Sequence, residues 1–420
     1  MKSSVSVVAV AAALFMHAAS AMAAGPQAEV MHWWVSAGES AAIKEVAKAY
    51  TAQGGVWKDN AIAGGEVAIA NIVSRITGGN PPTAAQMPLG KQVEDLVSQG
   101  LLAPIDDAAK ETGFYNNIPE TFQKAMTFKD GHMYALPIND HGHNWLWYNK
   151  KVLADAGAKE PVTWDDFFAA ADAIKAKGTA IPIAVGAQPW QLGQTFLSVL
   201  LTKEGPELFN KVFADLDVDA IKSPQFKDAV TTFLRLRDYS DNGAANREWN
   251  VAANMVITGK AGFQFMGDWA KGEYLAAGQK ADVDFGCQIL GNGDGKQYFN
   301  VSSDAIIFPV NKDPEQQKAQ AMLERVMMSK DVQVAFNSKK GSVPARLDVD
   351  ETKLDACAAK GIKILKDPAQ RIPNVDFLIS PDAIGAERDL AAQAWADPSY
   401  TPDKFVASLV QIIESEKSMR

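Results

Sequence analysis

Short apolar runs alternate with stretches of helical spacing along most of this chain. The first run, Val30 to Val35, has the length and aromatic content of a buried strand, and apolar residues then recur at helical spacing from Ile43 to Tyr50. Ligands bind beyond the carboxyl ends of strands in open α/β sheets, so Trp33, Trp34 and Glu39 lie where a pocket is expected. Neighbouring strand residues face opposite sides, so the plainer alternative is one core and one surface tryptophan.

The same order of strand and helix recurs in both halves of the chain. Helices are predicted to begin at Gly64-Gly65, at Thr163, where Asp166 provides a capping box, and at Pro314 after the cap Asp313. Predicted strands cover residues 83–87, 144–149, 181–185, 261–266 and 300–309. This alternation predicts an α/β fold with parallel strands and crossover helices.

Two extended segments are predicted to connect two lobes. Tyr134 to Asn139 contains a proline that favours extended backbone, and Lys339 to Arg346 combines glycine with proline. The strand at 261–266 ends in Asp268 and Trp269, so the second lobe also has a strand-end loop with an aromatic ring and a carboxylate. The predicted N-lobe comprises residues 24–138 with 303–344, and the predicted C-lobe comprises residues 139–302 with 345–420.

Residues 1–23 are predicted to form a secretory signal peptide. Lys2 precedes an apolar run from Val5 to Phe15, and the small-residue cleavage site Ala21-Met22-Ala23 follows. The apolar run is too short for a permanent anchor, which needs about 18 apolar residues. We therefore expect the mature protein to be exported to the periplasm.

Composition and charge narrow the classes of partner. The chain has 420 residues, and its 41 basic and 50 acidic side chains give a net charge of −9. Because no basic stripe is present to neutralise phosphates, nucleic acid is not an expected partner. Cys287 and Cys357 both belong to the exported part, where an oxidising compartment permits a disulfide. The alternative is two buried thiols that never meet.

Seven motifs occur in a fixed order along the mature chain. They are Trp33-Trp34 with Glu39, Asn80–Gln86, Asp130–Pro137, His141 with Asn144–Lys150, Gln188-Pro189-Trp190, Met266–Glu273 and Lys340–Pro344. Together they resemble the bacterial periplasmic glucose- and sugar-binding proteins of ABC importers, in family 1 of the extracellular solute-binding proteins. The resemblance implies a maltose-binding-protein-like α/β fold with two lobes, each a sheet flanked by helices, and a cleft between them.

The resemblance also implies which residues bind the sugar. They are Trp33, Trp34, Glu39, His141, Trp190, Trp269, Asp304 and Lys340. Asp304 matches the family's hydroxyl-binding aspartate, and Ser302 and Asn300 compete with it because the match is uncertain by a residue. A pyranose has an apolar C–H face and a rim of hydroxyls, so aromatic rings suit its face and charged groups suit its rim.

Three positions depart from glucose-binding relatives. Leu89 replaces a lysine, Gly142 replaces an arginine after His141, and the late pocket histidine is replaced near Phe377. Hydroxyl recognition depends on paired polar contacts. We therefore expect sugar binding, and leave open which sugar is bound.

The resemblance implies binding without chemistry, by a monomer that closes around its ligand and delivers it to an ABC transporter permease, with no cofactor or metal. Individual residues also suggest two other classes of protein, a glycosidase and a metal-binding protein. Glu39 and Asp304 could form the carboxylate pair of a glycosidase, which their separation would test. His141 and His143 would lie on one face of a strand, as in a metal site, but no third ligand is near in the sequence.

Overall fold

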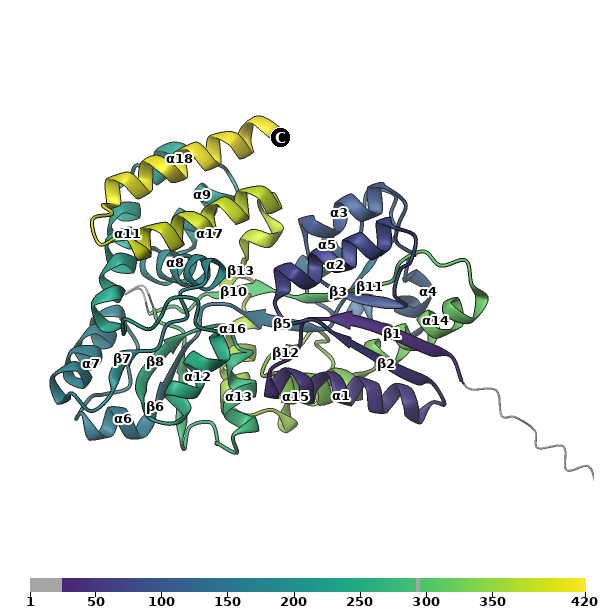
Figure 1. Ribbon diagram of the computed structural model, residues 1–420, viewed down its shortest axis with the longest axis horizontal. Coiled ribbons are helices and arrows are strands. Elements are labelled where there is room, and N and C mark those ends of the chain that lie inside the picture. The colour runs from purple at the N-terminus through teal and green to yellow at the C-terminus, as the bar shows by residue number, and fades with distance from the viewer. Residues whose placement is uncertain (1–24, 292–294) are drawn as a thin grey trace, which may run out of the picture.

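The computed structural model describes residues 25–291 and 295–420, so the predicted signal peptide lies outside the described residues. Figure 1 shows two lobes joined by a small central set of strands. We call the lobe that contains β1 the N-lobe and the lobe that contains β8 the C-lobe. No helix in the described part of the chain combines the length and the apolar character that crossing a membrane requires.

The N-lobe is built on a five-stranded sheet with the order β2-β1-β3-β11-β4. Its strands are β1 (Gln27–His32), β2 (Val56–Ala61), β3 (Ala84–Pro88), β4 (Ala135–Pro137) and β11 (Asp304–Ile307). β1 is parallel to β2 and β3, whereas β11 is antiparallel to β3 and β4. The prediction of parallel strands therefore fails at β11, which runs against the other four strands of this sheet, because β11 enters from the C-lobe through a crossing segment.

Helices cover both faces of the N-lobe sheet (Figure 1). They are α1 (Ala37–Ala52), α2 (Gly65–Thr77), α3 (Lys91–Ser98), α4 (Asp106–Glu111), α5 (Glu120–Met126), α14 (Pro314–Met328) and α15 (Lys330–Lys340). α1 begins with a capping box in which Ser36 and Glu39 satisfy each other's backbone N–H groups. This cap fixes the direction in which α1 leaves the end of β1.

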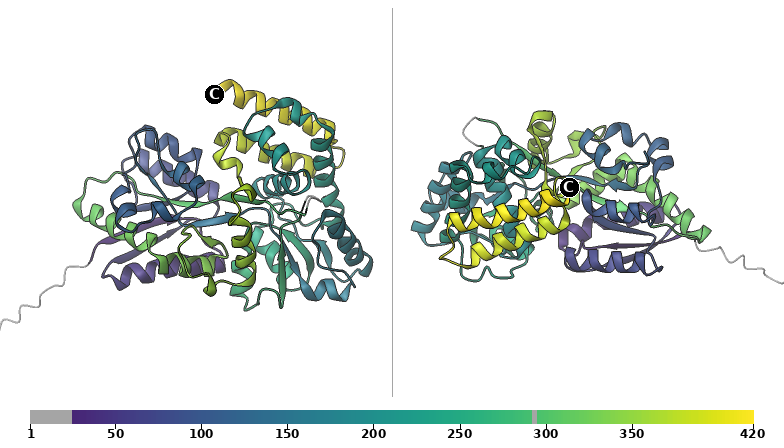
Figure 2. Two further views of the ribbon diagram at one scale, coloured as in Figure 1. Left: turned by 180° about the vertical axis from the view of Figure 1, so that it is seen from behind. Right: turned by 90° about the horizontal axis from the view of Figure 1, so that it is seen from above.

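The C-lobe contains a four-stranded sheet with the order β7-β8-β6-β9. β7 is parallel to β8, but β6 is antiparallel to both β8 and β9, so the predicted parallel strands are wrong at β6. Its strands are β6 (Leu146–Asn149), β7 (Ile181–Ile183), β8 (Ala261–Phe265) and β9 (Phe285–Gln288). Its helices are α6 (Lys150–Asp155), α7 (Trp164–Lys177), α8 (Pro189–Glu204), α9 (Pro206–Phe213), α10 (Val218–Ile221), α11 (Pro224–Arg235), α12 (Trp249–Ile257), α13 (Ala270–Ala276), α16 (Ala356–Leu365), α17 (Pro381–Ala396) and α18 (Pro402–Met419). Figure 2 shows α17 and α18 side by side along one side of this lobe, with the C-terminus directed toward the N-lobe.

A third sheet, with the order β12-β5-β10-β13, lies between the lobes. Its strands are β5 (Asn139–Gly142), β10 (Phe299–Ser302), β12 (Val343–Pro344) and β13 (Arg371–Pro373). The single strand predicted at 300–309 is thus two strands in two sheets. The strand is interrupted at Ser303, between β10 and β11. The Ser303 hydroxyl donates a hydrogen bond to the Asn139 carbonyl oxygen over 2.6 Å. Two segments that cross between the lobes are tied together at this point.

A disulfide joins Cys287 of β9 to Cys357 of α16. Both cysteines are buried, and their Cα atoms lie 6.0 Å apart. Because α16 follows the last crossing into the C-lobe, the bridge attaches this returning segment to the lobe's own sheet.

Candidate binding site

The turn after β1 is held by side chains rather than by neighbouring strands. β1 ends at His32, not at Val35 as predicted, because the next two N–H groups bond side chains instead of the backbone of a neighbouring strand. Trp33 donates its N–H to Gln86 Oε1 over 3.0 Å, and Trp34 donates to His32 Nδ1 over 3.2 Å. Polar side chains therefore replace the strand partners, and α1 can start within four residues.

The two tryptophans of this turn occupy different environments. Trp34 is only 1% exposed, stacks on His32 at 5.5 Å and meets Phe336 edge-on at 5.1 Å between ring centres. Its indole Nε1–H donates to Asp304 Oδ2 over 3.3 Å. Trp33 is half-buried. Trp34 is thus a core residue with one polar atom directed at a carboxylate, and Trp33 is the more accessible ring.

Glu39 joins the start of α1 to the end of α15. One carboxylate oxygen accepts the Ser36 N–H over 3.3 Å, and the other accepts from Lys340 Nζ over 3.1 Å. Lys340 is 3% exposed and Glu39 is 6% exposed, so this is a buried ion pair. Lys340 Nζ also lies 5.6 Å from the ring centre of Trp269, which the C-lobe contributes. Residues of both lobes therefore meet around one ammonium group.

The Asp304 carboxylate, at the start of β11, accepts hydrogen bonds from several side chains. Its donors are Trp34 Nε1 at 3.3 Å, Gln86 Nε2 at 2.9 Å, Asn139 Nδ2 at 3.1 Å and His141 Nε2 at 3.0 Å. Burial alone would raise the pKa of Asp304, but His141 and Lys340 outweigh burial and lower it below its usual range. An ionised carboxylate is therefore fixed in position between the lobes.

His141 bridges two carboxylates, one from each lobe. Its Nδ1 bonds Asp268, in the loop after β8, and its Nε2 bonds Asp304. Burial disfavours the charged ring, but the two carboxylates outweigh burial and raise the pKa of His141 to about 9. At neutral pH the imidazolium donates from both nitrogens. Sequence reasoning noted Asp268 at its strand end but did not assign it to the site.

His143 carries no charge at neutral pH. Burial and the nearby charge of His141 lower the pKa of His143 to about 3. Its Nδ1 accepts from Asn374 Nδ2 over 3.3 Å, so its Nε2 donates to Ser302 Oγ over 2.7 Å. The ring meets Trp269 edge-on at 5.1 Å. His143 thus supports the aromatic wall of the site, and its nitrogens are already engaged by protein groups.

The alternatives to Asp304 lie in different surroundings. Asn300 Oδ1 accepts from Asn374 over 2.6 Å, while Ser302 is bound to His143. Asp304, in contrast, lies in the network that contains Trp34 and His141. In residues 25–291 and 295–420, no group of three His, Cys, Asp or Glu side chains is arranged to hold a metal ion.

Trp190 lies near the aromatic ring of this centre, and the three departures from the glucose-binding pattern pack against apolar or backbone groups. Trp190, in the first turn of α8, has its ring 6.4 Å from that of Trp269. Leu89 is buried, and its N–H donates to the carbonyl oxygen of Ser303 over 2.9 Å. A Cβ at Gly142 would lie 2.5 Å from both Phe299 and Trp145, so an arginine does not fit there. Phe377 packs 6.4 Å from Phe122 of the N-lobe.

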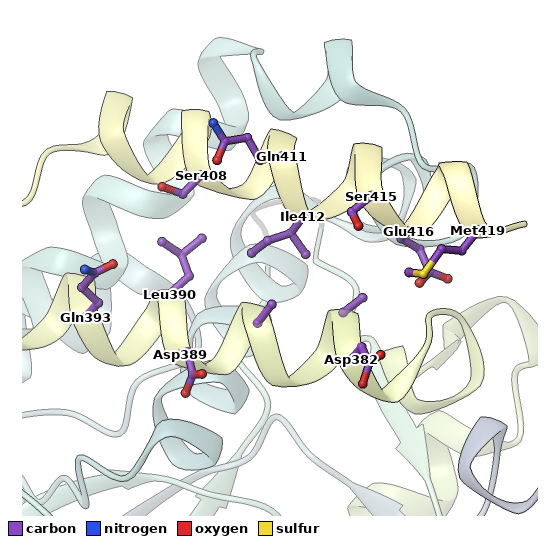
Figure 3. Close-up of a pocket in the computed structure, with 12 residues that line it drawn as sticks. Asp382, Asp389, Leu390, Gln393, Ser408, Gln411, Ile412, Ser415, Glu416 and Met419 are labelled. Atoms are coloured by element: carbon purple, nitrogen blue, oxygen red, sulfur yellow. The ribbon is translucent and has the colours of Figure 1, made fainter.

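A separate groove of about 850 Å³ lies between α17 and α18 (Figure 3). Asp382, Asp389 and Glu416 bring acidic groups to it, and Leu390 and Ile412 form part of its apolar lining. None of its lining residues belongs to the network around Asp304 and Lys340. This groove is therefore distinct from the site that the sequence indicated.

Comparison with known proteins identifies the family. Residues 34–333 match the bacterial extracellular solute-binding proteins. The chain belongs to this family. It is therefore a solute-binding protein rather than an enzyme, and the glycosidase alternative for Glu39 and Asp304 is set aside.

Two relatives in this family are similar over most of their length. A "Probable sugar-binding periplasmic protein" of Brucella suis biovar 1 (strain 1330) is 43% identical, over 81% of this chain and 79% of that protein. One of the same name from Rhizobium meliloti (strain 1021) is 42% identical, over 85% of each chain.

Solved structures of solute receptors share the fold. The receptor AcbH, described as having an exclusive preference for b-D-galactopyranose, aligns with a TM-score of 0.78 at 20% identity, over 94% of this chain and 99% of its own. A chitin oligosaccharide binding protein aligns with a TM-score of 0.77 at 21% identity, over 94% and 99%. The two-lobed fold of the maltose-binding-protein-like receptors is thereby established for this chain.

Proposed function

We propose that this protein binds an uncharged monosaccharide, such as glucose or another aldohexose, in the periplasm and delivers it as a monomer to an ABC transporter permease. The observation that carries the proposal is the meeting of Glu39, Lys340 and Asp304 from the N-lobe with Trp269 from the C-lobe. The sugar-binding and periplasmic names of relatives above 40% identity support the same assignment.

The chemistry of these groups suits a pyranose. An aromatic ring covers the apolar face of a sugar, while a carboxylate accepts from its hydroxyls and an ammonium group donates to them. Hydrogen bonds to charged groups contribute about 1.5–3 kcal/mol each, more than neutral ones. The direct pair between Glu39 and Lys340 shows that both charged ends reach the same small volume.

The balance of charge favours an uncharged sugar. Three carboxyl groups, those of Glu39, Asp268 and Asp304, face one lysine and the imidazolium of His141. Because positive charge is not in excess, a sugar acid or a sugar phosphate would lack a counter-ion here. A neutral hydroxyl rim has no such requirement.

Burial of the site supports a small ligand. Lys340, Glu39, Trp269 and His141 are buried by contacts with one another and with Asp304, so the groups proposed to bind the ligand are gathered in one small region, whereas an oligosaccharide would need a row of further subsites. Receptors with this fold include one for galactopyranose and one for chitin oligosaccharide, so the fold alone does not set ligand length. We base the choice of a monosaccharide on the enclosed polar centre.

A thermal-shift panel tests the proposal. The panel compares aldohexoses, pentoses, a disaccharide, a sugar acid and a sugar phosphate with the purified protein. A ligand at a hundred times its dissociation constant stabilises the fold by about 2.7 kcal/mol, so a cognate monosaccharide gives a clear rise in melting temperature. A larger rise with the disaccharide or with a charged sugar would overturn this assignment of the ligand, and no rise with any sugar would overturn sugar binding itself.

A further inference from the structure

The two lobes touch at three glycines, each from a different element. Gly38 lies in the first turn of α1, Gly272 lies in α13, and Gly341 ends α15 with a φ of +98°. A Cβ at Gly38 would lie 2.6 Å from the carbonyl carbon of Gly272. A Cβ at Gly272 would lie 2.8 Å from the carbonyl oxygens of Lys339 and Lys340. We call these three residues the glycine contact.

The neighbours in this contact are backbone atoms, which cannot rotate away as the end of a long side chain can. Cβ atoms essentially never come within 3.0 Å of another heavy atom, so a methyl group at Gly272, 2.8 Å from two carbonyl oxygens, requires the facing backbone to move. At Gly341 a Cβ would lie 2.4 Å from the carbonyl oxygen of Asp268, in a conformation that already favours glycine. The close approach of α13 to α1 and α15 therefore depends on glycine, which has no Cβ, at these three positions.

Each member of the glycine contact is adjacent in sequence to a residue of the candidate site or about one helical turn from it. Gly38 precedes Glu39, Gly341 follows Lys340, and Gly272 lies about one helical turn beyond Trp269. The spacing of the three backbones consequently sets how far Trp269 of the C-lobe lies from the Glu39–Lys340 pair of the N-lobe, now 5.6 Å from ring centre to Nζ.

A hydrogen bond between the lobes reinforces the contact. Glu273, the residue after Gly272, accepts the backbone N–H of Gly38 at its Oε1 over 2.8 Å. This N–H belongs to the first turn of α1, where helix geometry leaves it without a partner in the helix and where a carboxylate is favoured. Glu273 therefore holds α13 against α1 at the place where the glycines allow them to meet.

We propose that Gly38, Gly272, Gly341 and Glu273 are positioning residues for ligand binding. They set the separation of the lobes at which Trp269, Glu39 and Lys340 contact one sugar together. The proposal rests on the sugar-binding function proposed above. Hydrogen bonds weaken steeply with distance and angle, so a forced shift at this contact lowers affinity even though no ligand atom touches these residues.

The decisive variant is Gly272→Ala, with Gly385→Ala as its control. Both glycines lie in helices, where alanine is intrinsically preferred, so neither change is expected to disfavour its helix. Gly385, in α17, has no atom within 4 Å of an added Cβ. For the sugar that stabilises the parent most in the panel, we expect Gly272→Ala to weaken the dissociation constant at least about tenfold, or about 1.4 kcal/mol, and Gly385→Ala to leave it unchanged.

Three further measurements separate positioning from loss of folding. Unfolding curves of the ligand-free variants report whether each fold survives. Glu273→Gln keeps the shape of the side chain and weakens the bond to Gly38, so a loss of about two- to fivefold in affinity is expected even if Gly272→Ala does not fold. In a double-mutant cycle, Gly272→Ala and Glu39→Gln should lose less affinity together than the sum of their separate losses, because both act on the same contact with the sugar.

Two outcomes would overturn the inference, and they are distinguishable. If the parent binds a sugar and the folded Gly272→Ala and Glu273→Gln variants bind it equally well, the glycine contact does not position the site, while the proposed function stands. If the parent binds no sugar, the proposed function fails and this inference fails with it.

Discussion

Glu39 combines a structural role with the proposed role in binding, and its contacts allow the two to be separated. We expect Glu39→Gln to weaken sugar binding by about 1.5–3 kcal/mol, roughly ten- to hundredfold in the dissociation constant, because a charged acceptor is lost. Folding stability should fall as well, since Lys340 stays buried without its counter-charge. Titration calorimetry and unfolding curves on the same samples measure both effects.

Ser36→Ala is the matched control for this prediction. The Ser36 hydroxyl accepts the N–H of Glu39 in the capping box, and the substitution leaves the Glu39–Lys340 pair in place. Loss of the cap should cost about 0.5–2 kcal/mol of stability and leave sugar affinity unchanged. A Glu39→Gln variant that binds as tightly as the parent would show that the pocket is elsewhere.

Trp34 and Trp269 should respond differently to substitution. Trp34 is 1% exposed and packs against Phe336, so Trp34→Ala is expected to cost about 3–5 kcal/mol of folding stability. Trp269 lies beside Lys340, at 9% exposure, and Trp269→Leu keeps much of its apolar volume while removing the aromatic face. This variant should lose more affinity than stability. Unfolding curves and calorimetry decide, and the reverse order of effects would contradict the assignment.

Part of the candidate site follows from the pattern of elements, whereas Asp304, His141 and Lys340 are implied only by the family resemblance. Glu39 follows a strand and starts a helix, and Trp269 repeats that arrangement. The pairing of His141 with Asp268 could not be predicted, since 127 positions separate them and only the folded chain brings them together. The same holds for Glu273, whose partner Gly38 lies 235 positions away.

At the scale of elements, local signals were reliable where a cap or a stripe of apolar residues was present. α7 starts at the predicted Thr163 capping box and ends at Gly178 in the left-handed conformation, as expected. The strand β2 is not predicted because its sequence, Val-Trp-Lys-Asp-Asn-Ala, has no alternation of apolar and polar residues and its side chains are largely exposed, and its place is set by pairing with β1. The split between β10 and β11 likewise depends on contacts with two different sheets.

The packing of α17 on α8 contains a group that should make stability depend on pH. Glu387 is buried against Gly193, and neither of its carboxyl oxygens has a hydrogen-bond partner among the described residues. Burial raises the pKa of Glu387 to about 8, with Arg388 opposing the shift. The carboxyl therefore stays protonated in the fold at pH values where the unfolded chain has already released the proton.

The sign of this effect follows from linkage. Folding raises the pKa of the Glu387 carboxyl, so its contribution to the free energy of unfolding is fully present below the unfolded pKa of 4.5. That contribution is lost as pH rises toward 8. Relative to Glu387→Gln, the parent should lose about 1.4 kcal/mol of stability per pH unit across this window. Denaturant unfolding of both proteins at pH 5, 6, 7 and 8 measures the difference. Parallel stability profiles would contradict the prediction.

The bridge between β9 and α16 gives a second prediction at this scale. Protein isolated from the periplasm and denatured without reduction should show no free thiol, because Cys287 and Cys357 are bonded to each other. The sequence separation of 70 residues corresponds to a chain-entropy effect of about 4 kcal/mol, so reduction should lower the unfolding free energy by up to that amount. Two titratable thiols per chain would contradict the bridge.

At the scale of the whole molecule, residues proposed to bind sugar lie at or just after the segments that join the lobes. The chain crosses between β4 and β5, between β10 and β11, and between α15 and β12. Asn139 and His141 follow the first crossing, Asp304 follows the second, and Lys340 stands at the third. Any rotation of one lobe against the other therefore changes the positions of the groups proposed to bind sugar, so we expect ligand binding and lobe movement to be coupled through the same residues.

This coupling predicts that the bound sugar favours a more compact molecule. A ligand shifts an equilibrium between open and closed forms by its differential affinity, and a sugar that contacts Trp269 and Glu39 together makes its full set of contacts only when the lobes are close. Small-angle scattering should show a smaller radius of gyration at saturating sugar, with forward scattering that stays at the value of a monomer. Glu39→Gln at a sugar concentration too low to fill its weakened site should keep the ligand-free profile. If calorimetry establishes saturation and the scattering of the parent does not change, the lobes do not close on the ligand.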